Sequence, residues 1–175
     1  MSLDASTDEG ERRTWVWLSV NGETLHWTFP QESSEQGIPR TLRCVVAGEH
    51  VYFEKLDYTD GIEGEAWVHD SLLMAMPLGE SELVELLRTP NLDFDEHRRS
   101  AIGPWVPWRG GLALVLQGTG AQHKLVMSDG TREGTRVFEG WEQAPLAIEA
   151  IVAGDNRLWL DARTRESGEE LWVVE

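Results

Sequence analysis

The sequence predicts an all-β protein made of repeated four-stranded meanders, about four of them, in a small β-propeller-like architecture with one helical insertion. Three observations support this fold class. Short runs of β-branched and aromatic residues recur along the 175 residues, with Gly-, Asp- and Asn-rich turns between them. Two sequence blocks recur in the same order, since residues 46–53 and 64–68 are echoed by residues 152–159 and 168–173. Only one segment places apolar residues at helical spacing.

The chain begins with a predicted disordered acidic tail. Residues 1–12 mix Asp and Glu with Ser, Thr and Gly and have no periodicity. Two β-favouring runs follow at residues 14–20 and 23–29, and Asn21-Gly22 separates them. Asn-Gly is the strongest two-residue hairpin signal, because both residues accept the positive φ of a type I′ turn. We therefore expect residues 13–175 to form one domain that opens with this hairpin.

Further strands are predicted from apolar and β-branched runs that lie between turn signals. Residues 30–40 contain two prolines and form a loop, and an acidic loop is expected at residues 57–64. In the first half of the chain, the predicted strands are residues 41–46, 50–55, 65–69 and 72–76. In the second half, they are residues 112–117, 124–128, 135–139, 146–152, 157–161 and 170–174.

Residues 80–101 depart from this pattern and are predicted to be a helical insertion between repeats. Ser81 suits the N-cap of a helix, and Pro90 would end it. A second short helical turn is expected at residues 95–100. The apolar residues at helical spacing are Leu83, Val84, Leu86 and Leu87.

Two segments carry a motif that resembles a known family. Residues 125–137 read Leu-Val-Met-Ser-Asp-Gly-Thr-Arg-Glu-Gly-Thr-Arg-Val, and residues 168–173 read Gly-Glu-Glu-Leu-Trp-Val. Both resemble the bacterial tandem repeat whose consensus is Glu-Leu-Trp, two variable residues, Asp-Gly-Thr, two variable residues, Gly-Thr and an apolar strand. The resemblance implies a β-propeller-like fold and no catalytic residues. Asp129-Gly130-Thr131 itself suits a tight turn, in which Asp bonds local backbone and Gly takes a positive φ.

Charge is the strongest compositional signal. The chain has 31 Asp and Glu against 15 Lys and Arg, which gives a formal net charge of −16. Such a protein repels nucleic-acid backbones and anionic lipid surfaces, because both bind basic footprints. We therefore expect neither nucleic acid nor membrane as a partner. The charge either keeps the protein in solution or attracts a basic protein partner.

Cysteine content and the N-terminal residues bear on the compartment. Cys44 is the single cysteine, so no internal disulfide is expected, and its apolar neighbours predict a buried, inert thiol. Residues 1–13 lack the apolar core of a secretory signal, and no stretch approaches the roughly 20 apolar residues of a membrane span. These features predict a cytoplasmic protein, or an extracellular one if the chain is a fragment of a longer secreted protein.

No catalytic or metal-binding constellation is predicted. The sequence has no phosphate-binding glycine loop, nucleophile elbow or paired His on a helix, and its five His residues are scattered singly. The densest acidic loop contains Asp57, Asp60, Glu63 and Glu65, whose oxygens are of the kind that bind Ca²⁺, but the spacing differs from an EF-hand. A solvated, charged turn is the simpler interpretation, so neither a cofactor nor a metal is expected.

Nine Trp residues indicate either a core or a binding surface. Most lie on predicted strands at positions that the repeat relates, such as Trp67 and Trp172, which is typical of a recurring core. Trp105 and Trp108 differ, because they follow the insertion in a segment with two prolines. We expect these two in an exposed loop, as aromatic anchors for a ligand.

These features together predict a non-catalytic protein-interaction module, for example an inhibitor or immunity-type protein for a basic partner. A carbohydrate-binding module that uses exposed Trp is the alternative, and a glycoside hydrolase with two converging carboxylates is a third. If no N-terminal strand completes the last meander, a homo-oligomer or another partner would cover the open sheet edges. The candidate contact residues are Trp105, Trp108, Leu83, Leu87, Asp93 and Asp95. Asp93 and Asp95 flank a predicted helix end, where helix capping is the alternative role.

Overall fold

The structure is a computed structural model. It describes residues 43–56, 70–80, 82–90, 100–117, 122–140 and 145–175 in full, and the backbone of strands at 3–4, 13–20, 23–30, 57–60 and 66–69. These residues contain β-strands and no helix, and all strand pairs are antiparallel, which confirms the all-β class. No helix long and apolar enough to cross a membrane occurs among them. The chain forms two compact units, residues 1–38 and 39–175, so one domain over residues 13–175 stays a prediction.

The first unit contains a three-stranded sheet in the order β1-β2-β3. Its strands are β1 (Leu3–Asp4), β2 (Arg13–Val20) and β3 (Glu23–Pro30). Val20 pairs with Glu23, which leaves a two-residue connection and confirms the predicted hairpin. β1 belongs to the segment predicted to be a disordered tail, and it pairs with β2. The rest of that segment lies outside the described residues.

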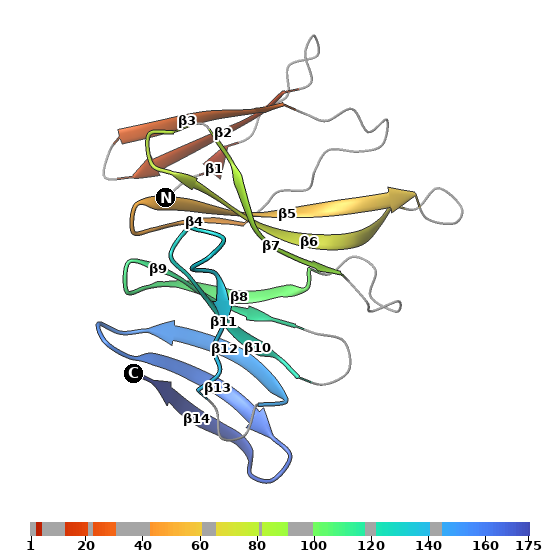
Figure 1. The fold of residues 1–175 in the computed structure, drawn as a ribbon, viewed down its shortest axis with the longest axis vertical. Coiled ribbons are helices and arrows are strands. Elements are labelled where there is room, and N and C mark those ends of the chain that lie inside the picture. The colour runs from red at the N-terminus through yellow and green to blue at the C-terminus, as the bar shows by residue number, and fades with distance from the viewer. Residues whose placement is uncertain are drawn as a thin grey trace. The chain divides into compact units, whose positions relative to one another are not determined.

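The second unit contains three antiparallel meanders, in which each strand pairs with the next along the chain (Figure 1). Sheet 1 consists of β4 (Cys44–Ala47), β5 (His50–Asp60), β6 (Ala66–Pro77) and β7 (Val84–Pro90). Sheet 2 consists of β8 (Ile102–Trp108), β9 (Gly111–Leu116), β10 (Lys124–Ser128) and β11 (Arg136–Val137). Sheet 3 has three strands in the described part of the chain: β12 (Ala147–Ala153), β13 (Leu158–Thr164) and β14 (Gly168–Val174).

Sheet 2 lies between sheets 1 and 3 and contributes to two cores. Successive side chains of a strand point to opposite faces, and in β9 both faces are apolar. Leu112 and Leu114 join a first core with sheet 1, whereas Ala113 and Val115 join a second core with sheet 3. Sheet 1 adds Ala47, Tyr52, Leu73, Ala75 and Leu86 to the first core. Sheet 3 adds Ile148, Ile151, Leu158, Leu160, Ala162 and Val174 to the second.

The turns that close the first hairpin of each meander are neighbours. A Cβ added to Gly48, in the β4–β5 turn, would lie 1.9 Å from the carbonyl oxygen of Gly110 in the β8–β9 turn. Arg109, in that second turn, donates to the carbonyl oxygen of Asn156 in the β12–β13 turn at 3.1 Å. The meanders therefore contact one another through their turns as well as through their faces.

The repeated sequence blocks fall on corresponding parts of the meanders. Residues 46–53 span the first hairpin turn of sheet 1, and residues 152–159 span that of sheet 3. The turns differ in length, because Ala47 pairs with His50 whereas Ala153 pairs with Leu158. The repeat is thus a repeat of strand order, and the residue-by-residue match ends at the turn.

The predicted helical insertion at residues 80–101 is wrong where the structure describes it. Residues 84–90 form β7, the fourth strand of sheet 1, and residues 91–99 lie outside the described residues. A β-bulge explains the helix-like spacing, because Leu73 pairs with Leu87 and Met74 with Glu85. The intervening Leu86 is buried in the first core, beside Leu87. Pairing with β6 therefore overrides the local pattern.

The loop predicted around the two prolines of residues 102–108 is also wrong. These residues form β8, an edge strand of sheet 2 with a bulge near its start. Edges and bulges tolerate proline, because a ladder hydrogen bond is not required at every residue there. Pro104 and Pro107 therefore mark an edge strand here and not a loop.

β5 and β6 extend beyond the strands predicted for them. β5 runs to Asp60, into the predicted acidic loop, and residues 61–65 lie outside the described part. β6 is continuous through Asp70 and Ser71, where a break between two strands was predicted. Elsewhere the agreement is closer: the strand predicted at 124–128 coincides with β10, and the strands predicted for the last meander overlap β12, β13 and β14.

Candidate functional site

The predicted contact residues of the insertion do not form a helical surface. Leu87 lies in β7 and packs against the first core, and Leu83 is half-buried just before β7. Asp93 and Asp95 lie outside the described residues. The role of these four residues in binding stays a prediction.

Trp105 and Trp108 lie in β8 and are half-buried, so the prediction of an exposed loop is wrong. Trp105 packs against the first core and Trp108 against the second. A guanidinium group lies over each ring, with Arg43 at 4.8 Å from the Trp105 centroid and Arg109 at 4.4 Å from the Trp108 centroid. These cation–π contacts cover one face of each indole. A part for the two Trp in binding remains a prediction.

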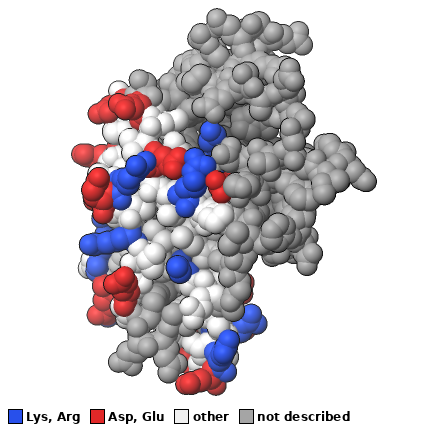
Figure 2. Space-filling view, turned by 45° about the vertical axis from the view of Figure 1, so that its right-hand side comes forward, with Lys and Arg blue, Asp and Glu red and all other residues white. Residues whose placement is uncertain are grey.

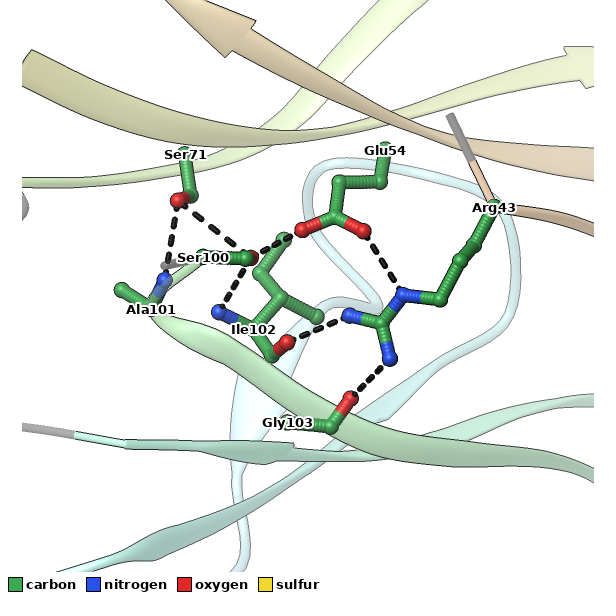
Figure 3. A network of polar contacts seen from close by, with 7 residues as sticks. All are labelled: Arg43, Glu54, Ser71, Ser100, Ala101, Ile102 and Gly103. Atoms are coloured by element: carbon green, nitrogen blue, oxygen red, sulfur yellow. Dashed lines mark hydrogen bonds and ion pairs between the residues drawn. The ribbon is translucent and has the colours of Figure 1, made fainter. Parts of the chain in front are cut away.

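A polar network joins sheet 1 to the start of sheet 2 (Figure 3). The Glu54 side chain is 5% exposed, and its carboxylate accepts from Arg43 Nε at 2.7 Å. The Arg43 guanidinium also donates to the carbonyl oxygens of Ile102 and of Gly103, the latter at 2.7 Å. Ser100 donates to the other oxygen of the Glu54 carboxylate. Both oxygens of this buried carboxylate therefore have donors.

Ser71 on β6 adds a further contact to the same network. Its hydroxyl oxygen accepts from the Ala101 amide at 2.9 Å, and it lies 3.4 Å from the Ser100 hydroxyl. A buried carboxylate needs both a counter-charge and hydrogen bonds, and the network provides them from protein groups. We interpret it as a structural link between two sheets and not as a reactive site.

Asp129-Gly130-Thr131 forms the predicted tight turn after β10. Asp129 Oδ1 accepts from the Thr131 hydroxyl at 2.7 Å and from the Thr131 amide at 2.9 Å, and these bonds lower the pKa of the Asp129 carboxyl. Gly130 has a φ of +94°, and a Cβ there would lie 2.4 Å from the His50 ring. Local hydrogen bonds and packing against sheet 1 thus occupy this motif.

Metal-binding and reactive groups are sparse in the described ranges. Within them, no three His, Cys, Asp or Glu side chains gather as a metal site would require. Cys44 is half-buried in β4, and burial raises the pKa of its thiol, which favours the protonated form. The predicted acidic loop, with Asp57, Asp60, Glu63 and Glu65, has its side chains outside the described part.

The face of sheet 3 that points away from sheet 2 carries exposed apolar side chains. Strand pairing places Val152, Trp159 and Val173 in one row across the three strands, and Leu171 lies on the same face of β14. The exposed fractions are 61% for Val152, 68% for Leu171 and 41% for Val173. We call these four residues the outer face of sheet 3. Single exposed apolar residues are ordinary, but a row across several strands is typical of a contact surface.

This outer face was not predicted, although residues 171–174 contain its signal. Leu-Trp-Val-Val places apolar residues at both odd and even positions, which is typical of a strand with two buried faces. Trp172 and Val174 belong to the second core, so Leu171 and Val173 point the other way. A strand with one solvated face would carry polar residues at those positions.

An open hollow of about 770 Å³ lies beside β14. β14 ends the strand order of sheet 3, so one of its edges has no partner strand in the described part of the chain. Phe138, from the segment after β11, and Trp172 of β14 line the hollow. Glu166 and Glu170 line it as well. The hollow thus combines apolar and acidic groups next to an open strand edge.

The charges around sheet 3 are mainly acidic. On the face seen in Figure 2, basic and acidic side chains of the described residues are interspersed, with uncharged surface between them. Residues 145–175 contain seven Asp or Glu and three Arg. Arg157 pairs with Glu175 at 2.9 Å, whereas Glu166 and Glu170 have no ion-pair partner among the described residues. Among the described residues, two of the three acidic side chains that line the hollow, Glu166 and Glu170, therefore have no counter-charge.

The fold and these surfaces define an all-β protein with stacked antiparallel meanders, whose last sheet has three strands in the described part of the chain. Comparison with protein-family models, with curated proteins and with solved structures finds no match. The resemblance to the bacterial tandem repeat therefore rests on residues 125–137 and 168–173, and it stays a prediction.

Proposed function

We propose that this chain is a non-catalytic protein-interaction module that binds a basic protein partner through the outer face of sheet 3. The row of apolar side chains on that face carries the proposal. Val152 and Leu171 are both more than half exposed, at 61% and 68%. The last sheet of a stacked array needs a polar outer face to remain alone in water, but on this face exposed apolar side chains lie beside the charged residues Asp161, Arg163 and Glu169.

The net charge of −16 supports a basic partner. Opposite charge speeds the encounter of two proteins and makes it sensitive to salt, while apolar contact supplies most of the affinity. An inhibitor or immunity-type protein that blocks a basic protein combines these two properties. The acidic residues around sheet 3 lie where they would act on such a partner.

The stacked meanders support a propeller-like arrangement and, with it, the resemblance to the bacterial tandem repeat. Both faces of sheet 2 pack against neighbouring meanders, as propeller blades do. A closed ring would leave no open outer face on sheet 3. The accessibility of Val152 and Leu171 in solution therefore tests ring closure and the interaction proposal together.

The carbohydrate-binding alternative has less support. A sugar ring stacks on an open indole face, and guanidinium groups of Arg43 and Arg109 lie over Trp105 and Trp108. A glycan array with Trp105→Ala and Trp108→Ala variants tests this alternative. Binding that is lost in both variants would favour it over the interaction proposal.

The test of the proposal compares two double substitutions that leave the net charge unchanged. Val152→Thr with Leu171→Gln makes the outer face polar. Leu78→Gln with Val84→Thr is the control, because these side chains are also exposed, at 39% and 36%, but belong to sheet 1 and its turn. A basic partner is isolated from native lysate on the wild-type chain, purified, and titrated against each variant by calorimetry.

Full burial of one such side chain contributes about 1.5–3 kcal/mol. We therefore expect the outer-face variant to bind the partner at least about tenfold more weakly than wild type, because even partial burial of two side chains exceeds that difference. The control variant should bind like wild type, and high salt should weaken binding in every case. Equal affinities for the two variants, or binding that salt leaves unchanged, would contradict the proposal.

A further inference from the structure

We infer that β14 binds an extended, basic segment of a partner protein as the fourth strand of sheet 3. The inference rests on the proposed function for the class of partner, and it adds the place and the conformation of the bound segment. Sheets 1 and 2 each have a fourth strand, β7 and β11, whereas sheet 3 ends at β14 in the described part of the chain. An open strand edge has unpaired N–H and C=O groups, which an added strand satisfies.

β14 lacks proline and lysine, two of the residues that keep a strand edge from pairing, and its charged residues are Glu169 and Glu170. The edge strand β7 ends at Pro90, and the edge strand β8 contains Pro104 and Pro107. Proline cannot donate to a ladder, so these two edges are poor templates for a further strand. β14 contains neither proline nor lysine. Its seven residues extend over about 23 Å, enough for a strand of ordinary length.

The hollow beside β14 offers room for the side chains of an added strand. It measures about 770 Å³ and has walls from β14 and from the residues after β11. Phe138 and Trp172, which also pack against the second core, form its apolar part. Side chains of a strand alternate between faces, so every second residue of the added strand would point into this space.

Acidic side chains at the hollow favour a basic segment. Glu166 and Glu170 line it without an ion-pair partner among the described residues. Glu175 also lines it and pairs with Arg157 at the surface. Lys or Arg of an added strand would pair with Glu166 and Glu170, whereas an acidic strand would be repelled. The occupant is therefore a strand with both apolar and basic residues.

The test uses a blocked peptide, Lys-Lys-Val-Val-Lys-Lys-Val, which places both residue types on each of its two faces. Two peptides serve as controls: one with Glu in place of every Lys, and one with Pro in place of the second Val, which cannot continue a ladder. Each is titrated against the full chain by calorimetry. Hydrogen exchange of individual backbone amides, followed by NMR, then locates the bound strand.

We expect the basic peptide to bind and to slow exchange at alternate amides of residues 168–174, because an added strand bonds every second residue of β14. The two control peptides should leave these amides unchanged. Glu166→Gln with Glu170→Gln should weaken binding by roughly 2- to 30-fold, since one exposed ion pair changes an equilibrium constant by a factor of roughly 1.4 to 5. Glu80→Gln with Glu133→Gln removes the same charge from exposed positions elsewhere and should change binding by less than about twofold.

Two results would overturn the inference. In one, both edges of β14 are already protected in the free chain, so a segment of the chain itself is the fourth strand. In the other, the basic peptide fails to bind or binds without slowing exchange in β14. The outer-face substitutions test the proposed function separately. If the peptide protects β14 but the variant with Val152→Thr and Leu171→Gln binds the partner as wild type does, strand addition at β14 is upheld and the proposed outer-face interaction is contradicted.

Discussion

Replacing Gly48 by Ala tests the contact between sheets 1 and 2. Gly48 has a φ of +59°, a left-handed conformation that costs Ala about 1–2 kcal/mol. The added Cβ would lie 1.9 Å from the Gly110 carbonyl oxygen, and this obstructing atom belongs to the backbone. Relief requires the two turns to move apart, at a typical overpacking cost of about 1–3 kcal/mol. We expect the free energy of unfolding to fall by about 2–5 kcal/mol.

Gly79→Ala is the matched control for this substitution. Gly79 has a φ of +86°, and no atom lies within 4 Å of an added Cβ, so only the conformational cost of about 1–2 kcal/mol applies. Gly110→Ala, at a φ of +75° and equally open, should behave in the same way. Urea unfolding followed by Trp fluorescence measures all three variants, with an unchanged m-value as the check on comparability. Equal losses for Gly48→Ala and Gly79→Ala would refute the contact between the turns.

Three further predictions concern single groups. Arg43→Ala leaves the Glu54 carboxylate buried without its counter-charge, and because the Arg43 side chain is 42% exposed we expect a loss of about 2–3 kcal/mol in urea unfolding, less than for a fully buried pair. In a chain that already carries Glu54→Gln, Arg43→Ala should lower the free energy of unfolding by at least about 1 kcal/mol less than it does in wild type. If the losses from the two substitutions simply add, Arg43 and Glu54 do not interact. Asp129 has a lowered pKa, so its stabilising contribution is complete above the unfolded value of about 4 and is lost as pH falls through the lower folded value. Plots of the free energy of unfolding against pH for wild type and Asp129→Asn should converge below about pH 4. Plots that stay parallel would show that the Asp129 carboxylate is not stabilised by its hydrogen bonds to Thr131. Burial raises the pKa of Cys44, so iodoacetamide should alkylate it more slowly in the native chain than in urea; equal rates would mean an accessible thiolate.

Turn chemistry supplied the most accurate sequence predictions. Asp129-Gly130-Thr131 encodes its conformation in adjacent residues, because positive φ and local side-chain bonds depend mainly on residue type. The Asn21-Gly22 signal correctly predicted that β2 and β3 pair as a hairpin. The repeated blocks placed the hairpins of the first and last meanders on corresponding strands. The first hairpin of each of these two meanders could therefore be anticipated without any knowledge of distant contacts.

The errors occurred where distant pairing determines the structure. The spacing of Leu86 and Leu87 resembles a helix, but the bulge opposite β6 turns both toward the first core. The polar pair Asp70-Ser71 looks like a strand break, yet Arg88 pairs with Asp70 at 2.9 Å and the Ala101 amide donates to Ser71 at 2.9 Å. Neither partner is adjacent in sequence, so local patterns could not indicate that a buried strand continues there.

The sequence predicted which kinds of residue form the candidate surface, but it did not predict where in the fold that surface lies. Net charge and abundant Trp indicated acidic and aromatic contacts, and both groups occur around β14. Which face of β14 is covered depends on the position of sheet 2, and which edge stays open depends on the number of strands in sheet 3. Single-strand patterns contain neither fact. Leu171 was therefore missed, and Trp105 was assigned to a loop.

The two apolar faces of sheet 2 have a consequence for synthesis of the chain. The ribosome synthesises the chain from the N-terminus, so sheet 1 has already been translated when β9 emerges and can pack against Leu112 and Leu114. Ala113 and Val115 lack the sheet 3 half of their core until residues 147–174 are translated. During that interval the nascent chain exposes a hydrophobic face of sheet 2, and exposed hydrophobic surface promotes aggregation and binds chaperones. Codons that slow translation of the final meander would lengthen this vulnerable period and lower the yield of folded protein.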